Sequence, residues 1–303
     1  MKPLLAYASL ILALGAGMWF FTAVHRMGPS SLIAKTKSVV VPAHTKPVNP
    51  MSGESSAVLA TTTIEVPEDG WITSFEQEFT GVPNNALRYS WVYDATQPDV
   101  YCPEVPRVIF VMSVEKVPNL SFPDGYGYFV RKGTALTIAG GFGNFSDTDY
   151  PDASMAVRLG FTPASRGSLE NAYPIFLNSV CTSIFTIPPH TGVFVKNLSH
   201  PFSIPFDGTI TFIGTHAHKY VTDILLTLNG KELWRTSSIH LPDWTNLGNP
   251  AYVAPYNGIP VSKGDMVDLI ETYTNPTSGP VDAMSSVYMQ LILKTTKPAP
   301  TMH

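Results

Sequence analysis

The chain has 303 residues, and because 44% of them are hydrophobic it can bury a sizeable core. Only 14% of the residues are charged, whereas proline (27) and glycine (22) are frequent, a balance typical of short strands joined by many turns. The net charge is -4 and no stripe of lysine and arginine occurs, which argues against nucleic-acid binding because phosphate contacts need clustered basic residues.

Residues 1–26 contain an apolar run. Leu4–Val24 carries no charge and as a helix would span about 31 Å, close to the hydrocarbon thickness of a bilayer. We interpret residues 1–26 as a membrane anchor. A cleaved signal peptide is the alternative, with Ala13 and Gly15 as the small residues of a cleavage site. Both interpretations place the rest of the chain in the periplasm or outside the cell.

Residues 27–60 are rich in proline, serine, threonine and lysine and lack periodicity, so they predict a flexible linker. Short apolar segments between turn-forming residues then predict a first β-sandwich domain over 61–165. Its expected strands are Trp71–Thr80, Leu87–Tyr93, Arg107–Val114, Ala135–Ala139 and Met155–Phe161.

A connector over 166–182 leads to a second predicted β-sandwich domain over 183–295, and residues 296–303 form a tail. Asn229-Gly230 between two apolar segments predicts a hairpin with a type I′ turn. The sequence thus predicts an all-β fold of two consecutive antiparallel sandwiches, jelly-roll-like, after a transmembrane helix. The expected strands of the second are Gly192–Lys196, Thr209–Ile213, Ile224–Leu228, Met266–Thr274 and Val287–Leu293.

The chain has two cysteines, Cys102 and Cys181, which lie too far apart in sequence for a CxxC redox or zinc motif. Since an exported chain meets an oxidising compartment, we predict a disulfide between them. Two buried free thiols are the alternative.

Two histidines, His216 and His218, flank Ala217 just after a predicted strand. Residues i and i+2 of a strand point to the same face, so both imidazoles can bind one metal ion. Two ordinary surface histidines are the alternative reading of the pair. His190 and His200 lie beside prolines in loops and are expected to be solvated.

The order of motifs after residue 183 resembles the C-terminal domain of the copper type II, ascorbate-dependent monooxygenases, the family of peptidylglycine α-hydroxylating monooxygenase and dopamine β-monooxygenase. This resemblance implies that copper is bound by His216, His218 and a downstream methionine, Met284. A thioether favours Cu(I), and imidazole suits both oxidation states. The motifs are, in order, Ile187-Pro188-Pro189, His216-Ala217-His218, the hairpin around Asn229-Gly230, Lys263-Gly264-Asp265, Tyr273-Thr274-Asn275 and Asp282-Ala283-Met284.

The first domain departs from that family. The family's His-His-Met run corresponds here to residues 85–90, and its later histidine corresponds to residues 140–144, yet neither segment contains histidine. Arg88 in the first segment stays protonated and cannot bind copper. The resemblance therefore implies that the family's first copper site has been lost.

The resemblance leaves three functions open. The first is an enzyme with one copper ion that hydroxylates an activated C–H bond, using O₂ and an external one-electron reductant such as ascorbate. The second is a non-catalytic copper binder or carrier that serves a membrane-protein partner. The third is a metal-free β-sandwich interaction module, because a fold does not determine a function.

Overall fold

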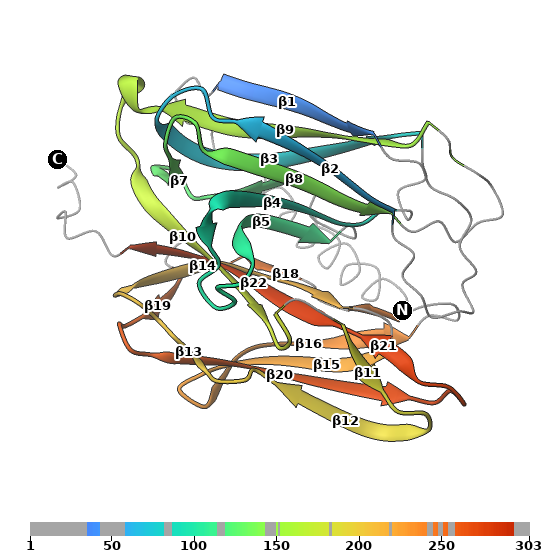
Figure 1. Ribbon diagram of the computed structural model, residues 1–303. Helices are drawn as coiled ribbons and strands as arrows, with labels where there is room; N and C mark the ends of the chain where they lie inside the picture. The colour runs from blue at the N-terminus through green and yellow to red at the C-terminus, as the bar shows by residue number, and fades with distance from the viewer. Residues whose placement is uncertain are drawn as a thin grey trace, which may run out of the picture. The chain divides into compact units, whose positions relative to one another are not determined.

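A computed structural model of the protein describes most of the chain after residue 34, and its regular structure is almost entirely β (Figure 1). Among these residues the helical element is a 3-10 turn at Ala164–Arg166. The predicted all-β class is thereby confirmed. The described residues are 35–42, 58–81, 87–113, 119–142, 150, 152–181, 184–217, 220–240, 245–247, 251–253 and 258–293.

The first sandwich has a four-stranded sheet in the order β2-β8-β4-β5 opposite the strands β1-β9-β3-β7. Its core contains Phe75 and Phe110, whose rings stack with centroids 5.9 Å apart. The strands are β1 (Lys35–Pro42), β2 (Val58–Glu65), β3 (Gly70–Thr80), β4 (Leu87–Pro98), β5 (Pro106–Ser113), β6 (Asn119–Ser121), β7 (Tyr126–Val130), β8 (Ala135–Phe142) and β9 (Ser154–Pro163).

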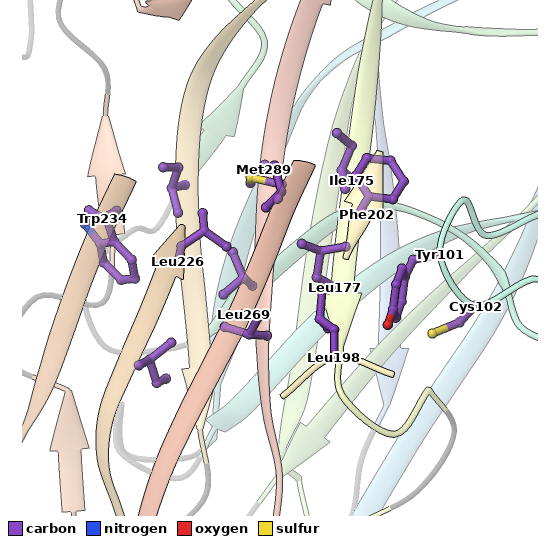
Figure 2. Packing of buried hydrophobic residues seen from close by; sticks show 14 of the residues in the cluster. Tyr101, Cys102, Ile175, Leu177, Leu198, Phe202, Leu226, Trp234, Leu269 and Met289 are labelled. Carbon is purple, nitrogen blue, oxygen red and sulfur yellow. The ribbon is translucent and has the colours of Figure 1, made fainter. Parts of the chain in front are cut away.

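The second sandwich places β10-β22-β14-β18 opposite β12-β20-β15-β16-β17, around a second hydrophobic core shown in Figure 2. Met289 and Leu269, from facing sheets, are both fully buried in this core. The strands are β10 (Glu170–Asn178), β11 (Phe185–Ile187), β12 (Thr191–Asn197), β13 (Phe202–Ser203), β14 (Gly208–Ala217), β15 (Val221–Leu228), β16 (Lys231–His240), β17 (Thr245–Leu247), β18 (Ala251–Val253), β19 (Ile259–Val261), β20 (Met266–Asn275), β21 (Val281–Ala283) and β22 (Ser285–Leu293).

Strands β10, β14 and β22 are buried on both faces. Val287 and Met289 of β22 belong to the second core, whereas Tyr288 belongs to the first, together with Phe176 of β10 and Phe212 of β14. This explains why β22 reads as a nearly continuous apolar run rather than an alternating one. The two sandwiches therefore share a sheet, and the described residues fall in one compact unit.

The hydroxyl group of Tyr288 links this shared sheet to β5. It donates a hydrogen bond of 2.7 Å to the backbone oxygen of Ile109, and both residues are buried. Tyr288→Phe would leave that oxygen without this donor, so we expect the free energy of unfolding to fall by about 1–2 kcal/mol. Urea denaturation of the variant measures the loss. An unchanged midpoint at an unchanged slope would show that water replaces the hydroxyl at no cost.

The predicted hairpin at Asn229-Gly230 is confirmed. Leu228 pairs with Lys231 across the turn, so the loop between β15 and β16 has two residues. Asn229 and Gly230 have φ of 52° and 74°. A type I′ turn requires positive φ at both central positions, which Asn and Gly adopt most readily.

Three predicted segments differ from or lie outside the observed fold. The predicted linker 27–60 contains β1, which pairs with β9 along Lys35–Pro42. The predicted connector 166–182 contains β10, which pairs with β22. The predicted anchor, residues 1–26, lies outside the described residues, and within those residues no helix is long and apolar enough to cross a membrane.

Candidate functional site

The predicted metal ligand His216 lies near the end of β14 and is only 8% exposed. It pairs with Ser286 of β22, and Ala217 pairs with Ser285. His218, the second predicted imidazole ligand, lies outside the described residues. His216 is therefore held by strand pairing with β22, which fixes its backbone more firmly than a loop would.

Met284, the predicted sulfur ligand, directly precedes β22 and is half-buried. It stands two residues before Ser286, the partner of His216. Antiparallel pairing therefore brings Met284 and His216 to the same end of two neighbouring strands, where diagonal positions lie about 7–8 Å apart at Cα. A ligand set of two imidazoles and a thioether suits copper, because thioether sulfur binds Cu(I) and imidazole binds both oxidation states. The two described donors, the imidazole of His216 and the thioether of Met284, are of the kinds that copper binds.

The two segments that the sequence resemblance matches to the family's first copper site are neighbours in the structure. Tyr89 and Ser90 of β4 pair with Gly141 and Gly140 of β8. The strands therefore bring together the positions that would carry the ligands, but this sequence has no histidine there. The hydroxyl of Ser90 is instead hydrogen-bonded to the side-chain oxygen of Gln77.

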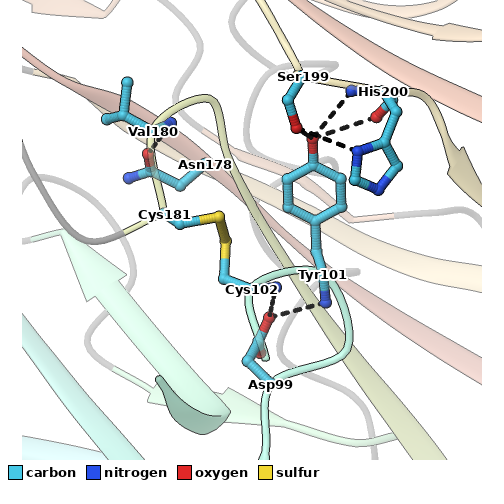
Figure 3. The surroundings of a disulfide bond; sticks show 8 residues. All are labelled: Asp99, Tyr101, Cys102, Asn178, Val180, Cys181, Ser199 and His200. Carbon is cyan, nitrogen blue, oxygen red and sulfur yellow. Dashed lines mark hydrogen bonds between the residues drawn. A yellow bond between two sulfur atoms is a disulfide. The ribbon is translucent and has the colours of Figure 1, made fainter. Parts of the chain in front are cut away.

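The predicted disulfide is confirmed: Cys102 and Cys181 are joined, with their Cα atoms 5.3 Å apart. Figure 3 shows its surroundings. The Asp99 carboxylate accepts hydrogen bonds from the backbone N–H groups of Tyr101 (3.0 Å) and Cys102 (3.1 Å). Burial raises the pKa of Asp99 despite these bonds and the nearby Arg107. The disulfide thus joins a tightly held loop between β4 and β5 to the turn after β10.

Glu104 lies beside this disulfide, and its carboxylate is within 4.8 Å of both sulfur atoms. Two cysteines and a carboxylate could hold a metal ion if both sulfurs were thiolates. Here they are bonded to each other, so neither sulfur carries the charge that a thiolate ligand needs. We therefore do not assign a metal site to this group.

His190 and His200 were expected to be solvated loop residues, and both are exposed. His200 nevertheless has close neighbours. Its ring lies 5.0 Å from that of Tyr101, and its Nδ1 atom is 3.1 Å from the Ser199 hydroxyl (Figure 3). These contacts pack the loop after β12 against the loop that carries Cys102.

A buried carboxyl group, Glu271, was not assigned a role from the sequence. It lies in the middle of β20 with a fully buried side chain. Its Oε2 atom accepts hydrogen bonds from the hydroxyls of Ser179 (2.8 Å) and Tyr273 (3.3 Å). Burial is the main cause that raises the pKa of Glu271 to about 7, while Ser285, Ser179, Tyr273 and Lys196 act to lower it. Burial also raises the pKa of Tyr273, and the neighbouring carboxylate adds to this rise.

The sequence does carry a signal for this group. In β20 every second residue is buried, and the inward positions are Val267, Leu269, Glu271, Tyr273 and Asn275. A glutamate on the apolar face of an alternating strand is unusual, because a buried charge costs several kcal/mol unless it is paired or protonated. This pattern could have marked Glu271 as a residue of interest, although not its partners.

Comparisons with known proteins do not identify a family. No family model and no curated protein matches the sequence. Among solved structures, the major capsid protein P2 of bacteriophage PM2 is 11% identical with a TM-score of 0.34, covering 87% of this chain and 100% of that one. PNGase F, a glycosylasparaginase from Flavobacterium meningosepticum, is 12% identical with a TM-score of 0.34, covering 86% and 97%. Likenesses this weak support no argument about function, so any functional assignment depends on the residues of this chain.

Proposed function

We propose that this chain is a membrane-anchored copper protein whose two jelly-roll-like sandwiches lie outside the cytoplasm and bind one copper ion through His216, His218 and Met284. The observation that carries the proposal is the register of β14 and β22, which brings His216 and Met284 to the same end of neighbouring strands. The disulfide agrees with an oxidising compartment, and the apolar run Leu4–Val24 agrees with a membrane anchor.

When bound, copper would supply the oxygen activation needed to hydroxylate a C–H bond, with electrons from a reductant such as ascorbate. The role of the protein is to hold the side chains that donate to the metal, those of His216, His218 and Met284. His216 sits on β14 with little exposure, and Met284 directly precedes β22, the neighbouring strand. The partly buried thioether would stabilise the reduced ion, because soft sulfur prefers Cu(I).

A second function, copper binding without catalysis, is favoured by one specific observation. The segments that the resemblance matches to the family's other copper site pair with each other in the structure, but they contain no histidine. A single copper ion would need its second electron from a reductant that docks directly. A copper carrier that serves a membrane-protein partner has no such need.

The test of the site is copper binding by the full chain in detergent micelles. We expect one copper ion per chain, and we expect His216→Ala to weaken binding of both Cu(I) and Cu(II) by roughly 100-fold or more, since it removes a direct ligand. Met284→Leu keeps the side chain apolar and of similar volume, so it should weaken Cu(I) far more than Cu(II). Chelator competition measures both affinities, and X-ray absorption detects sulfur ligation.

The matched controls are His190→Ala and His200→Ala, which remove exposed imidazoles outside the proposed site. Both should bind copper as the unaltered chain does. Equal copper affinity in the unaltered chain and in His216→Ala would refute the site, and no copper binding by the unaltered chain would favour the metal-free interaction module. Aerobic consumption of ascorbate by the copper-loaded protein then distinguishes an enzyme from a carrier.

A further inference from the structure

The interior of the second sandwich contains a polar cluster that the proposed copper site does not use. It consists of Ser179, Glu271, Tyr273 and Ser285, all of them buried. Besides its bond to Glu271, the Tyr273 hydroxyl lies 3.0 Å from the Ser285 hydroxyl, and Ser285 acts to lower the pKa of the carboxyl group. Two hydroxyls from different elements thus bond the carboxyl group, and a third hydroxyl, that of Ser285, lies beside them inside an apolar core.

The other carboxyl oxygen of Glu271, Oε1, is buried and has no hydrogen-bond partner among the described residues. A buried carboxylate with only one oxygen satisfied is costly, so the arrangement favours the protonated, neutral form. The facing groups do little to offset this cost. Lys196 of β12 is the cation that lowers the pKa of Glu271, and its effect is the smallest of the causes. The strand partner of Glu271 in β15 is the apolar Ile224. Burial keeps Tyr273 in its neutral form.

Ser179 connects this cluster to the disulfide. It lies in the turn that follows β10, where the side chain of Asn178 accepts a hydrogen bond of 2.9 Å from the backbone N–H of Val180. Cys181, two residues after Ser179, has a positive φ of 57° and is bonded to Cys102. The bond from Ser179 to Glu271 therefore ties the cysteine-bearing turn to the interior of the second sandwich.

We propose that Ser179, Glu271, Tyr273 and Ser285 form a buried proton-binding site that keeps the turn at residues 178–181 closed, and that loss of this proton makes the Cys102–Cys181 disulfide accessible to reductants. Val180 and Cys181 of the turn are partly exposed, whereas β20 and β22 are interior strands, so we take the turn as the route by which water reaches the carboxyl group. Opening the turn admits water to the carboxyl group. Hydration stabilises the ionised form far more than the neutral form, so opening becomes easier once the proton is lost.

The experiment measures the rate at which a water-soluble phosphine reduces the disulfide in the native full chain, from pH 5 to pH 8. The phosphine attacks one sulfur, the S–S bond breaks, both sulfurs end as thiols with protons from water, and the phosphine becomes its oxide. Each rate is divided by that of Glu271→Gln, a neutral isostere, which cancels the pH dependence of the phosphine itself. We expect this ratio to rise by roughly tenfold or more between pH 5 and pH 8, below a limit of about 70-fold set by complete exposure of the carboxyl group.

Glu104→Gln is the matched control, because it removes an exposed carboxylate that lies within 4.8 Å of the same sulfurs. This control should keep the pH profile of the unaltered chain. A ratio to Glu271→Gln that stays constant with pH would overturn the proposal. Should Glu271→Gln fail to fold, as judged by circular dichroism, Ser179→Ala is the second test. This variant removes the hydrogen bond between the turn and Glu271, so it should speed reduction of the disulfide at pH 5 several-fold. An unchanged rate of reduction would also overturn the proposal.

Discussion

Replacing Cys102 and Cys181 together by alanine is expected to lower the free energy of unfolding by about 4 kcal/mol. The disulfide closes a loop with a sequence separation of 79 residues. On the chain-entropy account, a cross-link over a loop of that length removes much of the conformational freedom of the unfolded chain. The link also joins the β4–β5 loop to the turn after β10, so its loss frees two segments that otherwise constrain each other.

Urea denaturation followed by circular dichroism measures this effect. The chemically reduced chain is the matched control, because it lacks the cross-link but keeps both sulfur atoms, and it should lose nearly as much stability as the double variant. A loss below about 1 kcal/mol in both would mean that the unfolded chain is already compact around these residues. A large loss in the alanine variant alone would instead assign the effect to packing of the buried Cys102 side chain.

The sequence predicted features that depend on local chemistry. Asn229-Gly230 specifies a two-residue turn because the required backbone conformation is restricted to few residue types. The disulfide was predicted because the chain has two cysteines and is expected to be exported. The prediction of export was based on the apolar segment at the N-terminus alone. Neither inference required knowledge of which strands pair.

Strand β10 was missed for a physical reason. Pro174 argues against an interior strand because it has no N–H group to donate. In the structure, Pro174 pairs with Gln290 of β22 on one side, while on the other side β10 pairs with β7 only at Glu170 and Asn171. Pro174 therefore lies beyond the point where the pairing between β10 and β7 ends. Where that pairing ends depends on how the strands assemble into the sheet, so the sequence alone does not show it.

The buried proton site could not be assembled from the sequence either. Ser179 and Glu271 are 92 residues apart, and Tyr273 meets Ser285 only because β20 and β22 face each other across the core. The candidate copper site could be predicted in part from the sequence. The His-x-His spacing is local, but the approach of Met284 to His216 depends on the register of β14 with β22.

The stability of the protein should decrease as pH rises from about 5 to 7, and Glu271→Gln should remove much of this decrease. The pKa of Glu271 is about 7 in the folded protein, against an ordinary value of 4.5. Between these values the unfolded chain releases its proton while the folded chain keeps it, so unfolding is favoured as pH rises. The stabilisation is fully present below pH 4.5 and lost above about pH 7. The full difference corresponds to about 3 kcal/mol.

Glu271→Gln keeps the shape of the side chain but cannot ionise, so it should unfold at a higher urea concentration than the unaltered chain at pH 8. At pH 5 the two should be nearly equal. The raised pKa of Asp99 acts in the same direction in both proteins, so the comparison between them isolates Glu271. Glu78→Gln, at a side chain that is 69% exposed, is the control and should shift stability by no more than about 0.5 kcal/mol at either pH. Parallel pH profiles for Glu271→Gln and the unaltered chain would mean that the carboxyl group is already hydrated in the folded protein, and the raised pKa would then have no structural basis.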